Sequence, residues 1–168
     1  MMVSTKGRYA LIVMMDLANN EGDGVISLSD IAERQNLSMK YLEIVVSMLN
    51  KGGLLKSLRG KNGGYRLARK PEEYNIGEIL EITEGSLAPV ECLKNDHVSC
   101  EKAASCGTLP LWLGLDMVID NYLENITLRD IIDGNMDRIL PKGITMADYK
   151  ESCRAKRRAA EEKMQGEM

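Results

Sequence analysis

A mostly α-helical fold with one small β-hairpin is the class that the sequence predicts, and three observations point to it. Apolar residues recur at helical spacing in several segments, and most of these segments follow a Ser, Thr or Asn that can cap a helix. Residues 54–68 depart from this pattern, because two short apolar runs flank a glycine-rich turn, as in a hairpin. Residues 109–124 form a long apolar stretch, which indicates a further helix.

Three helices are expected before the hairpin, each beginning at a capping residue. They cover about residues 4–19 after Ser4 or Thr5, about 28–35 after Ser27, and about 38–51 after Ser38. A short strand over residues 25–26 could lie between the first two. Because the second and third helices are separated only by a short turn at residues 35–37, they form a helix-turn-helix unit.

The third helix has an apolar face and a polar stripe. The apolar face contains Leu42, Val45, Val46 and Leu49, and the stripe contains Lys40, Glu43, Ser47 and Asn50. A helix with such a stripe fits the major groove of DNA, which is about 12 Å wide. The stripe could equally face solvent, and the basic hairpin that follows is what favours DNA.

The expected hairpin is strongly basic. Its strands, about Leu54–Leu58 and Tyr65–Ala68, flank a turn at residues 61–64, where Asn-Gly and Gly-Gly tolerate the positive φ of tight turns. Residues 51–70 carry seven basic side chains and no acidic one. A basic hairpin after two short helices is typical of a winged helix-turn-helix, and its cations favour binding to DNA phosphates.

The rest of the chain divides into further helices, a loop and a tail. Asn75 is expected to cap a helix of about residues 76–84, and Thr127 a short one of about 128–132, while residues 86–108 show no period and form a loop. We therefore expect a winged helix-turn-helix domain over residues 1–70, a sensor loop and dimerisation helices over 71–134, and a charged C-terminal tail over 135–168. Residues 150–168 of that tail form either a solvated helix or a frayed end.

The helix at residues 109–124 is too widely apolar for a single packing partner. One face contains Leu111, Leu115, Val118 and Tyr122, and an adjacent face contains Trp112, Ile119 and Leu123. An arc of this width needs cover on more than one side, and in a small chain this favours a homodimer interface. The alternative is that the helix packs only on its own domain.

Charge and composition narrow the functional classes. The net charge is −3, but residues 1–70 hold eleven Lys and Arg against six Asp and Glu, whereas residues 71–168 hold eleven against nineteen. This asymmetry suits a partner that contacts one end of the chain, such as nucleic acid. No segment approaches the roughly 18–20 uninterrupted apolar residues of a membrane span, and the N-terminus lacks the apolar core of a secretion signal. A cytoplasmic protein without a membrane partner is expected.

The cysteines and the single histidine define the available chemistry. An enzyme is not expected, because His97 is the only histidine and the chain has no phosphate-binding glycine loop, HExxH motif or obvious nucleophile–base pair. In a cytoplasmic protein the four cysteines argue against a structural disulfide framework. Cys92, Cys100 and Cys106 fall within fifteen residues, and this clustering indicates metal or redox chemistry.

Four motifs occur together along the chain. They are STKGRYA at residues 4–10, LSDIAERQ at 28–35 followed by Ser38 and Tyr41-Leu42-Glu43, LRGKNGGYRL at 58–67, and Trp112 with NITL at 125–128. In combination they resemble the iron–sulfur cluster regulator (IscR-type) family of bacterial winged helix-turn-helix transcriptional repressors, over about residues 2–134. The resemblance implies a homodimeric repressor that senses a signal through an iron–sulfur cluster in its cysteine loop.

The residues expected to contact DNA lie on the third helix and on the hairpin: Ser38, Lys40, Tyr41, Glu43, Arg59, Gly60 and Lys61. Glu43 either accepts a hydrogen bond from a cytosine N4 amine or forms an internal ion pair, for instance with Lys40. Arg59 either enters a narrow minor groove or contacts phosphates only. Because a twofold dimer carries two reading helices, it predicts a pseudo-palindromic operator in double-stranded DNA.

The resemblance implies Cys92, Cys100 and Cys106 as ligands of a [2Fe-2S] or [4Fe-4S] cluster, and such clusters usually have four protein ligands. The chain departs from the best-known members in two respects. The spacer between the first two cysteines is longer, and Leu109 stands where some members have a histidine. The fourth ligand is therefore open among His97, Asp96, Glu91, Glu101, Cys153 and a residue of a second subunit such as Met1 or Ser4.

Two cluster-free alternatives also follow. The same three cysteines could respond to thiol oxidation or hold zinc instead of a cluster. Some relatives, in addition, are regulated by binding a metabolic partner protein, and this chain could be regulated in the same way. In both cases the DNA-binding part of the prediction is unchanged, and only the signal differs.

Overall fold

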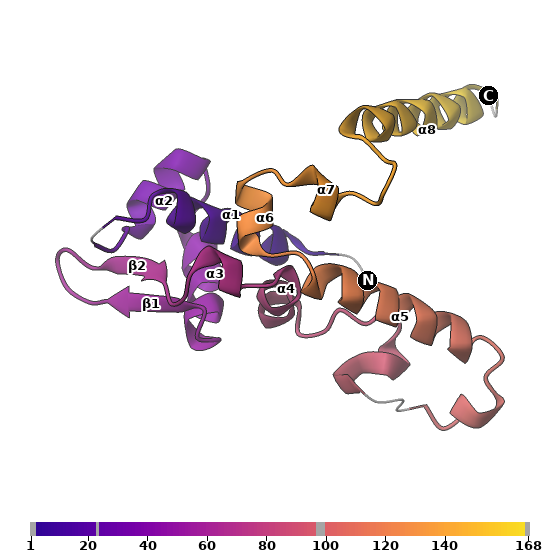
Figure 1. Ribbon diagram of the computed structural model, residues 1–168, viewed down its shortest axis with the longest axis horizontal. Coiled ribbons are helices and arrows are strands. Elements are labelled where there is room, and N and C mark those ends of the chain that lie inside the picture. The colour runs from indigo at the N-terminus through magenta and orange to yellow at the C-terminus, as the bar shows by residue number, and fades with distance from the viewer. Residues whose placement is uncertain (1–2, 23, 97–99, 167–168) are drawn as a thin grey trace. The chain divides into compact units, whose positions relative to one another are not determined.

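The computed structural model describes residues 3–22, 24–96 and 100–166, which divide into two units, Met1–Asp133 and Gly134–Met168. The first unit contains α1 (Thr5–Asn19), α2 (Leu28–Gln35), α3 (Met39–Lys51), β1 (Leu55–Leu58), β2 (Gly64–Leu67), α4 (Ile76–Glu84), α5 (Leu109–Glu124) and α6 (Leu128–Ile132) (Figure 1). The second contains α7 (Met136–Ile139) and α8 (Met146–Gly166). The predicted fold class, mostly helical with a small antiparallel hairpin, is confirmed.

Side-chain caps begin several helices at the predicted residues. A cap of this kind satisfies a backbone N–H that the first turn of a helix leaves without a partner. In four helices the capping side-chain oxygen accepts a hydrogen bond from a backbone N–H: Lys6 N to Ser4 Oγ at 3.1 Å, Asp30 N to Ser27 Oγ at 3.2 Å, Glu78 N to Asn75 Oδ1 at 2.8 Å and Asp130 N to Thr127 Oγ1 at 3.1 Å. Because these signals are local, the sequence was sufficient to place these four helix starts.

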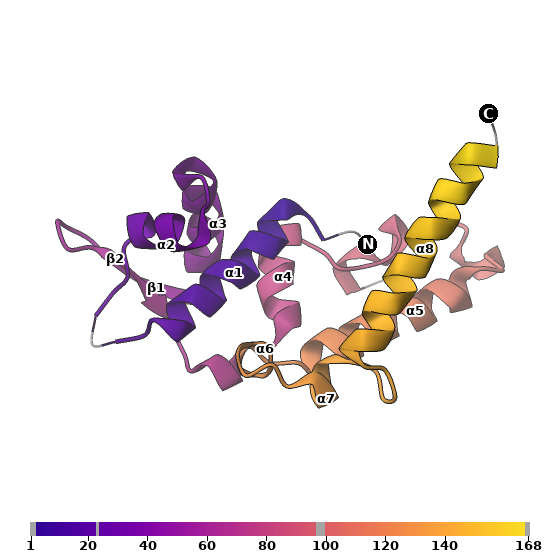
Figure 2. The same ribbon diagram turned by 90° about the horizontal axis from the view of Figure 1, so that it is seen from above.

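The core of the first unit is built around α1. This helix contacts α2, α3, α4, α6 and β2, and Figure 2 shows it between α2 and α3 on one side and α4 on the other. Its fully buried residues include Val13 and Met14, and those of α3 include Leu42 and Val46, as their helical spacing predicts. Leu, Ile, Val and Met therefore fill a core in a chain that has no Phe.

The hairpin packs one face on this core and turns the other outward. Leu55 pairs with Leu67 on the buried face, whereas the neighbouring pair, Lys56 and Arg66, is exposed. The strand expected at residues 25–26 is reduced to a single bridge, in which Ile26 and Tyr65 exchange two backbone hydrogen bonds of 2.8 Å. This bridge attaches the segment before α2 to β2.

The remaining segments differ from expectation in detail. The cysteine loop contains two short 3₁₀ turns, Glu91–Asp96 and Ala103–Ser105. In the second unit α8 begins at Met146, earlier than the expected helix or frayed tail, and the short helix α7 was not predicted. Within the described residues, no helix is both long enough and apolar enough to cross a bilayer.

Candidate nucleic-acid interface

The start of α3 presents polar groups that the chain does not use. Ser38 and Lys40 are exposed, and Ser38 occupies the N-cap position. The Ser38 hydroxyl makes no capping hydrogen bond, so the predicted cap is correct in position but not in bonding. The backbone carbonyl of Ser38 accepts hydrogen bonds from the N–H groups of Tyr41 and Leu42 at 3.1 and 3.0 Å. The hydroxyl therefore lies beside a helix N-terminus, where backbone N–H groups favour an anion.

Glu43 is the one carboxylate among the predicted DNA contacts, and it is exposed. Across residues 3–22, 24–96 and 100–166 no salt bridge involves Glu43 or Lys40. The internal ion pair that was one alternative for Glu43 is therefore not seen among the described residues, and its contact with a cytosine amine stays a prediction.

Tyr41 contacts an aromatic side chain on a different helix. Its ring meets that of Tyr9 on α1 edge to face, with centroids 5.2 Å apart and planes at 77°. Both tyrosines are half-buried. Edge-to-face pairs stabilise by about 0.5–1.5 kcal/mol beyond their burial, so Tyr9 restricts the rotamers of Tyr41. The sequence pattern carried no signal for this contact, because the two tyrosines lie on different helices.

The tip of the hairpin carries Arg59, Gly60 and Lys61, all of them exposed. Figures 1 and 2 both show this tip projecting beyond the helices. The turn is closed by a hydrogen bond from Gly63 N to Gly60 O at 3.0 Å. The left-handed residue is Gly60, with φ of +114°, so the expectation that the positive φ falls within residues 61–64 is wrong. We call Arg59–Gly63 the wing tip.

Two arginines of the first unit form salt bridges, whereas the cations of the wing tip form none with any described residue. Arg34 Nη2 lies 2.6 Å from Asp16 Oδ2, and Arg69 Nη2 lies 2.9 Å from Glu78 Oε2. In the part of the chain that the structure describes, no salt bridge reaches Arg59 or Lys61. The wing tip therefore presents uncompensated positive charge, which favours a polyanion.

Tyr74 fixes the base of the wing, and the sequence prediction did not single it out. Its hydroxyl donates to Leu54 O at 2.8 Å and accepts from the N–H groups of Ala68 and Arg69 at 2.9 and 2.8 Å. Tyr74 is fully buried, and the Arg69 guanidinium lies 4.4 Å from its ring centroid. These contacts join both ends of the hairpin to the segment that leads into α4.

The cysteine loop does not form a ready-made metal site. Cys92, Cys100 and Cys106 are half-buried free thiols, which are suitable cluster ligands by chemistry. Among the described residues, however, no three His, Cys, Asp or Glu side chains are close enough to hold a metal ion together. Two candidates for a fourth ligand, His97 and Met1, lie outside the described residues.

One of the three thiols is linked to the adjoining helix. Cys106 Sγ lies 3.4 Å from Thr108 Oγ1, and Trp112 Nε1 donates to the same oxygen at 3.2 Å. The hydrogen bond from the Thr108 hydroxyl lowers the pKa of the Cys106 thiol. Thr108 was not predicted to be functional, and only its place between Cys106 and Trp112 could have suggested it.

Helix α5 leaves its apolar surface uncovered. None of its residues is buried within the chain. Its largely exposed apolar side chains are Leu111, Leu113, Leu115, Met117, Val118 and Tyr122. Apolar surface of this extent on one helix marks an interaction site. The face with Trp112, Ile119 and Leu123 is half-buried and α5 contacts α4, so the alternative that α5 packs only on its own domain stays open.

A helix-turn-helix followed by a basic, uncompensated hairpin defines a winged helix-turn-helix DNA-binding protein. The chain belongs to the Rrf2 family, described as iron-dependent transcriptional regulators, whose profile matches residues 3–134. It is thus a DNA-binding transcriptional regulator, and its homologues are regulators rather than enzymes. The predicted resemblance to the IscR-type family is confirmed.

Two kinds of relative are similar to the chain. The HTH-type transcriptional regulator CymR of Bacillus subtilis (strain 168) is 39% identical over 131 residues, which are 78% of this chain and 89% of CymR. The HTH-type transcriptional regulator IscR of Aliivibrio salmonicida (strain LFI1238) is 37% identical over 135 residues, which are 80% of this chain and 79% of IscR.

Solved structures of both kinds share the fold. The structure of CymR, described as the global cysteine regulator of B. subtilis, matches with a TM-score of 0.64 at 38% identity and covers 79% of this chain and 97% of CymR. The structure of T. potens IscR matches with a TM-score of 0.62 at 38% identity and covers 85% of this chain and 94% of IscR.

Proposed function

We propose that the chain is a homodimeric, sequence-specific repressor of transcription in the bacterial cytoplasm, whose cysteine loop senses iron–sulfur or redox status. The observation that carries the DNA-binding part is the pairing of an exposed α3 start with an uncompensated basic wing tip. The dimer is supported by the uncovered apolar surface of α5. The sensor role is supported by three half-buried free thiols in one loop.

In this proposal α3 reads the major groove and the wing tip an adjacent minor groove. Ser38, Lys40 and Tyr41 contact phosphates or bases at the N-terminal end of α3, and Glu43 accepts from a cytosine N4 amine. Arg59 enters the minor groove, and Lys61 anchors a phosphate. Gly60 allows the backbone to approach the DNA closely, because it has no Cβ.

Two substitutions at the wing tip test whether Arg59 contacts the minor groove and Lys61 a phosphate. Arg59→Ala should weaken binding to the operator by about 1–3 kcal/mol more than binding to random DNA, because a groove contact is lost. Lys61→Ala should weaken binding to both DNAs by similar amounts. It should also lower the slope of log K against log salt concentration by about 1, because one phosphate contact is lost. Fluorescence anisotropy over a salt series measures both quantities. An equal loss on both DNAs for Arg59→Ala would limit Arg59 to a phosphate contact.

The twofold axis of the proposed dimer determines the form of the operator. Two copies of α3 related by such an axis require two half-sites, about one helical turn or a multiple of it apart. We therefore propose a pseudo-palindromic operator. Selection of bound sequences from a random duplex library tests this, and recovery of a single unpaired half-site would contradict it.

The sensor is proposed as an iron–sulfur cluster held by Cys92, Cys100 and Cys106, with His97 one candidate for the fourth ligand. A bound cluster would supply redox and oxygen-sensitive chemistry. The described residues supply suitable thiols but do not bring three ligands together. Anaerobic purification with iron and acid-labile sulfide counted per chain is the direct test.

A cluster-free regulator is the second candidate, and two observations favour it. The described residues do not gather three ligands, and the chain is as similar to CymR, the global cysteine regulator of B. subtilis, as to IscR. In this form thiol oxidation or a metabolic partner protein carries the signal. A colourless, iron-free protein with intact operator binding would support it, and a stoichiometric cluster would exclude it.

A further inference from the structure

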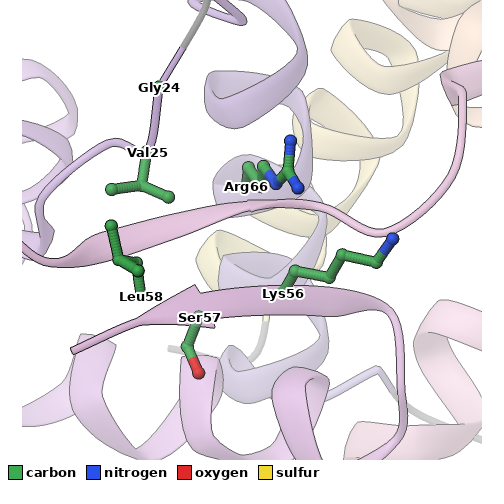
Figure 3. A pocket seen from close by; sticks show the side chains of 6 residues that line it. All are labelled: Gly24, Val25, Lys56, Ser57, Leu58 and Arg66. Carbon is green, nitrogen blue, oxygen red and sulfur yellow. The ribbon is translucent and has the colours of Figure 1, made fainter.

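The outer face of the wing carries a basic hollow that the proposed contacts of α3 and the wing tip do not use. Its volume is about 540 Å³, and it is lined by Gly24, Val25, Lys56, Ser57, Leu58 and Arg66. Figure 3 shows Lys56 and Leu58 on one side of β1 and Ser57 pointing to the other. No carboxylate is among the lining residues.

The charges in this hollow are placed unfavourably for an isolated protein. Lys56 and Arg66 are direct partners in the register of β1 and β2. Residues paired in this way have Cβ atoms about 4.5–5.5 Å apart, and like charges at such positions destabilise a hairpin. Neither side chain forms a salt bridge with any described residue. An anion between them would remove the repulsion.

The walls of the hollow are fixed before any ligand arrives. The two backbone hydrogen bonds between Ile26 and Tyr65 hold the segment that contains Gly24 and Val25 against β2. Gly64 lies so close to the Ile26 carbonyl that any added Cβ would overlap it. The two cations are therefore presented on a rigid frame, which reduces the conformational entropy lost on binding.

The position of the hollow indicates which anion it binds. Lys56 precedes Arg59 by three residues, which span at most about 10 Å of extended chain, so the hollow is close enough to the wing tip to contact the same duplex. Leu58 is 58% exposed beside the two cations and offers an apolar contact. A sugar–phosphate backbone has both an apolar and an anionic surface.

We propose that Lys56 and Arg66 bind backbone phosphates of the duplex just outside the half-site, with Leu58 packed against a deoxyribose. This inference rests on the proposed DNA binding and adds a sequence-independent contact to it. Because phosphate contacts carry no base information, the hollow should raise affinity for operator and random DNA by the same factor. It should also require duplex that extends beyond the half-site.

The salt dependence of DNA binding tests the inference. Lys56→Gln with Arg66→Gln should lower the slope of log K against log salt concentration by about 2, equally on operator and random duplex. The matched control, Lys150→Gln with Arg154→Gln on α8, removes the same charge from exposed positions and should leave the slope unchanged. An unchanged slope for the wing variant, or an equal drop for the control, would overturn the inference.

A second variant distinguishes the loss of phosphate contacts from the loss of the fold. Arg66→Glu places opposite charges across the hairpin, so the protein should unfold at the same or a higher temperature while losing the phosphate contacts. Shortening the duplex to the bare half-sites should weaken the wild type and leave Arg66→Glu unaffected. A wild-type protein that binds no duplex in a salt-dependent way would overturn the proposed function itself, a result distinct from failure of the hollow alone.

Discussion

A single carboxylate, that of Asp16, holds the end of the first helix of the helix-turn-helix. Its side chain is 1% exposed on α1 and accepts hydrogen bonds from Arg34 Nε at 3.1 Å and Gln35 Nε2 at 2.7 Å, besides the salt bridge to Arg34. Burial by itself raises the pKa of Asp16, but the hydrogen bonds from Arg34 and Gln35 outweigh it and hold that pKa below its ordinary value. The end of α2 is thereby tied to α1, immediately before the turn into α3.

We predict that Asp16→Asn lowers the free energy of unfolding by about 1–3 kcal/mol at neutral pH, because Arg34 loses a charged partner. The folded-state pKa of Asp16 is depressed, so its contribution is present above the unfolded value of about 3.9 and is lost as the pH falls through the folded value. The difference between wild type and variant should therefore shrink below about pH 4. Urea unfolding at several pH values measures it.

The exposed Glu21→Gln serves as the control for this pH series, since it removes a carboxylate without removing a salt bridge. A gap between wild type and Asp16→Asn that stayed constant from pH 7 to strongly acid conditions would show that the ionised carboxylate is not what stabilises the contact.

The Tyr74 hydroxyl permits a second test at a single atom. Tyr74→Phe keeps the ring under Arg69 but removes an acceptor for two backbone N–H groups and a donor to Leu54 O. Leaving such groups unpaired costs about 1–3 kcal/mol, so the midpoint of urea unfolding should fall while its slope is unchanged. Tyr65→Phe is the matched control, because its hydroxyl has no hydrogen bond within the described chain. Equal stability of the two variants would contradict this role.

At the scale of elements, the wing shows how far local sequence determines a turn. Residues 59–63 connect β1 to β2, and a loop of this length is most often built around an ordinary type I turn. The Gly63–Gly60 hydrogen bond closes that turn, and only Gly60 adopts a left-handed conformation. The sequence RGKNGG indicates a turn but does not say which glycine bends. That choice depends on where the strand register begins.

Gly63 is constrained by space and Gly60 by its φ, and this difference can be measured. A Cβ on Gly63 would lie 2.5 Å from Leu58 O and 2.9 Å from Gly60 O, both backbone atoms, whereas at Gly60 it would meet nothing within 4 Å. Gly63→Ala should therefore reshape the wing tip and lower DNA affinity. Gly60→Ala should cost about 1–2 kcal/mol of strain in place. Gly22→Ala, in open space, is the control and should change neither stability nor affinity.

Helices were predictable where a cap and an apolar period coincide within a few residues, as at Ser27 and Asn75. The site was predictable only in part. The contact of Tyr9 with Tyr41 and the bond of Arg34 to Asp16 join residues on different helices, and no local period reports them. The sequence also did not predict that the Ser38 hydroxyl makes no capping hydrogen bond. The residue type at a cap position does not reveal whether its side chain accepts a hydrogen bond from the helix.

At the scale of the whole molecule, the charge asymmetry of the sequence corresponds to a division of surface. The wing tip and the start of α3 carry exposed cations that form no salt bridge with any described residue, whereas the long apolar α5 follows in the acidic part of the chain. The three-part division at residues 70 and 134 stays a prediction, although the structure separates Gly134–Met168 from the rest. A DNA reader that requires two half-sites needs a second surface for self-association, and α5 offers one.

We predict that Val118→Glu converts the proposed dimer to a monomer. Val118 is 65% exposed within the chain, beside Met117 at 71%, so the charge is harmless to a single subunit but would be buried in a twofold interface through α5. Burial of an unpaired carboxylate costs several kcal/mol, which corresponds to a dissociation constant raised at least about 100-fold. Sedimentation equilibrium measures this shift. The monomer should also bind a full operator no better than one half-site, because the second reading helix no longer arrives with the first.

Ala147→Glu is the control, since it places the same charge at an exposed position of α8 and should leave the association state unchanged. The far-ultraviolet spectrum and unfolding midpoint of Val118→Glu separate a lost interface from a lost fold: the secondary structure should persist at concentrations where the wild type is dimeric. A Val118→Glu protein that remains dimeric with wild-type affinity would exclude α5 as the interface. The exposed apolar surface of α5 would then have to face a different partner.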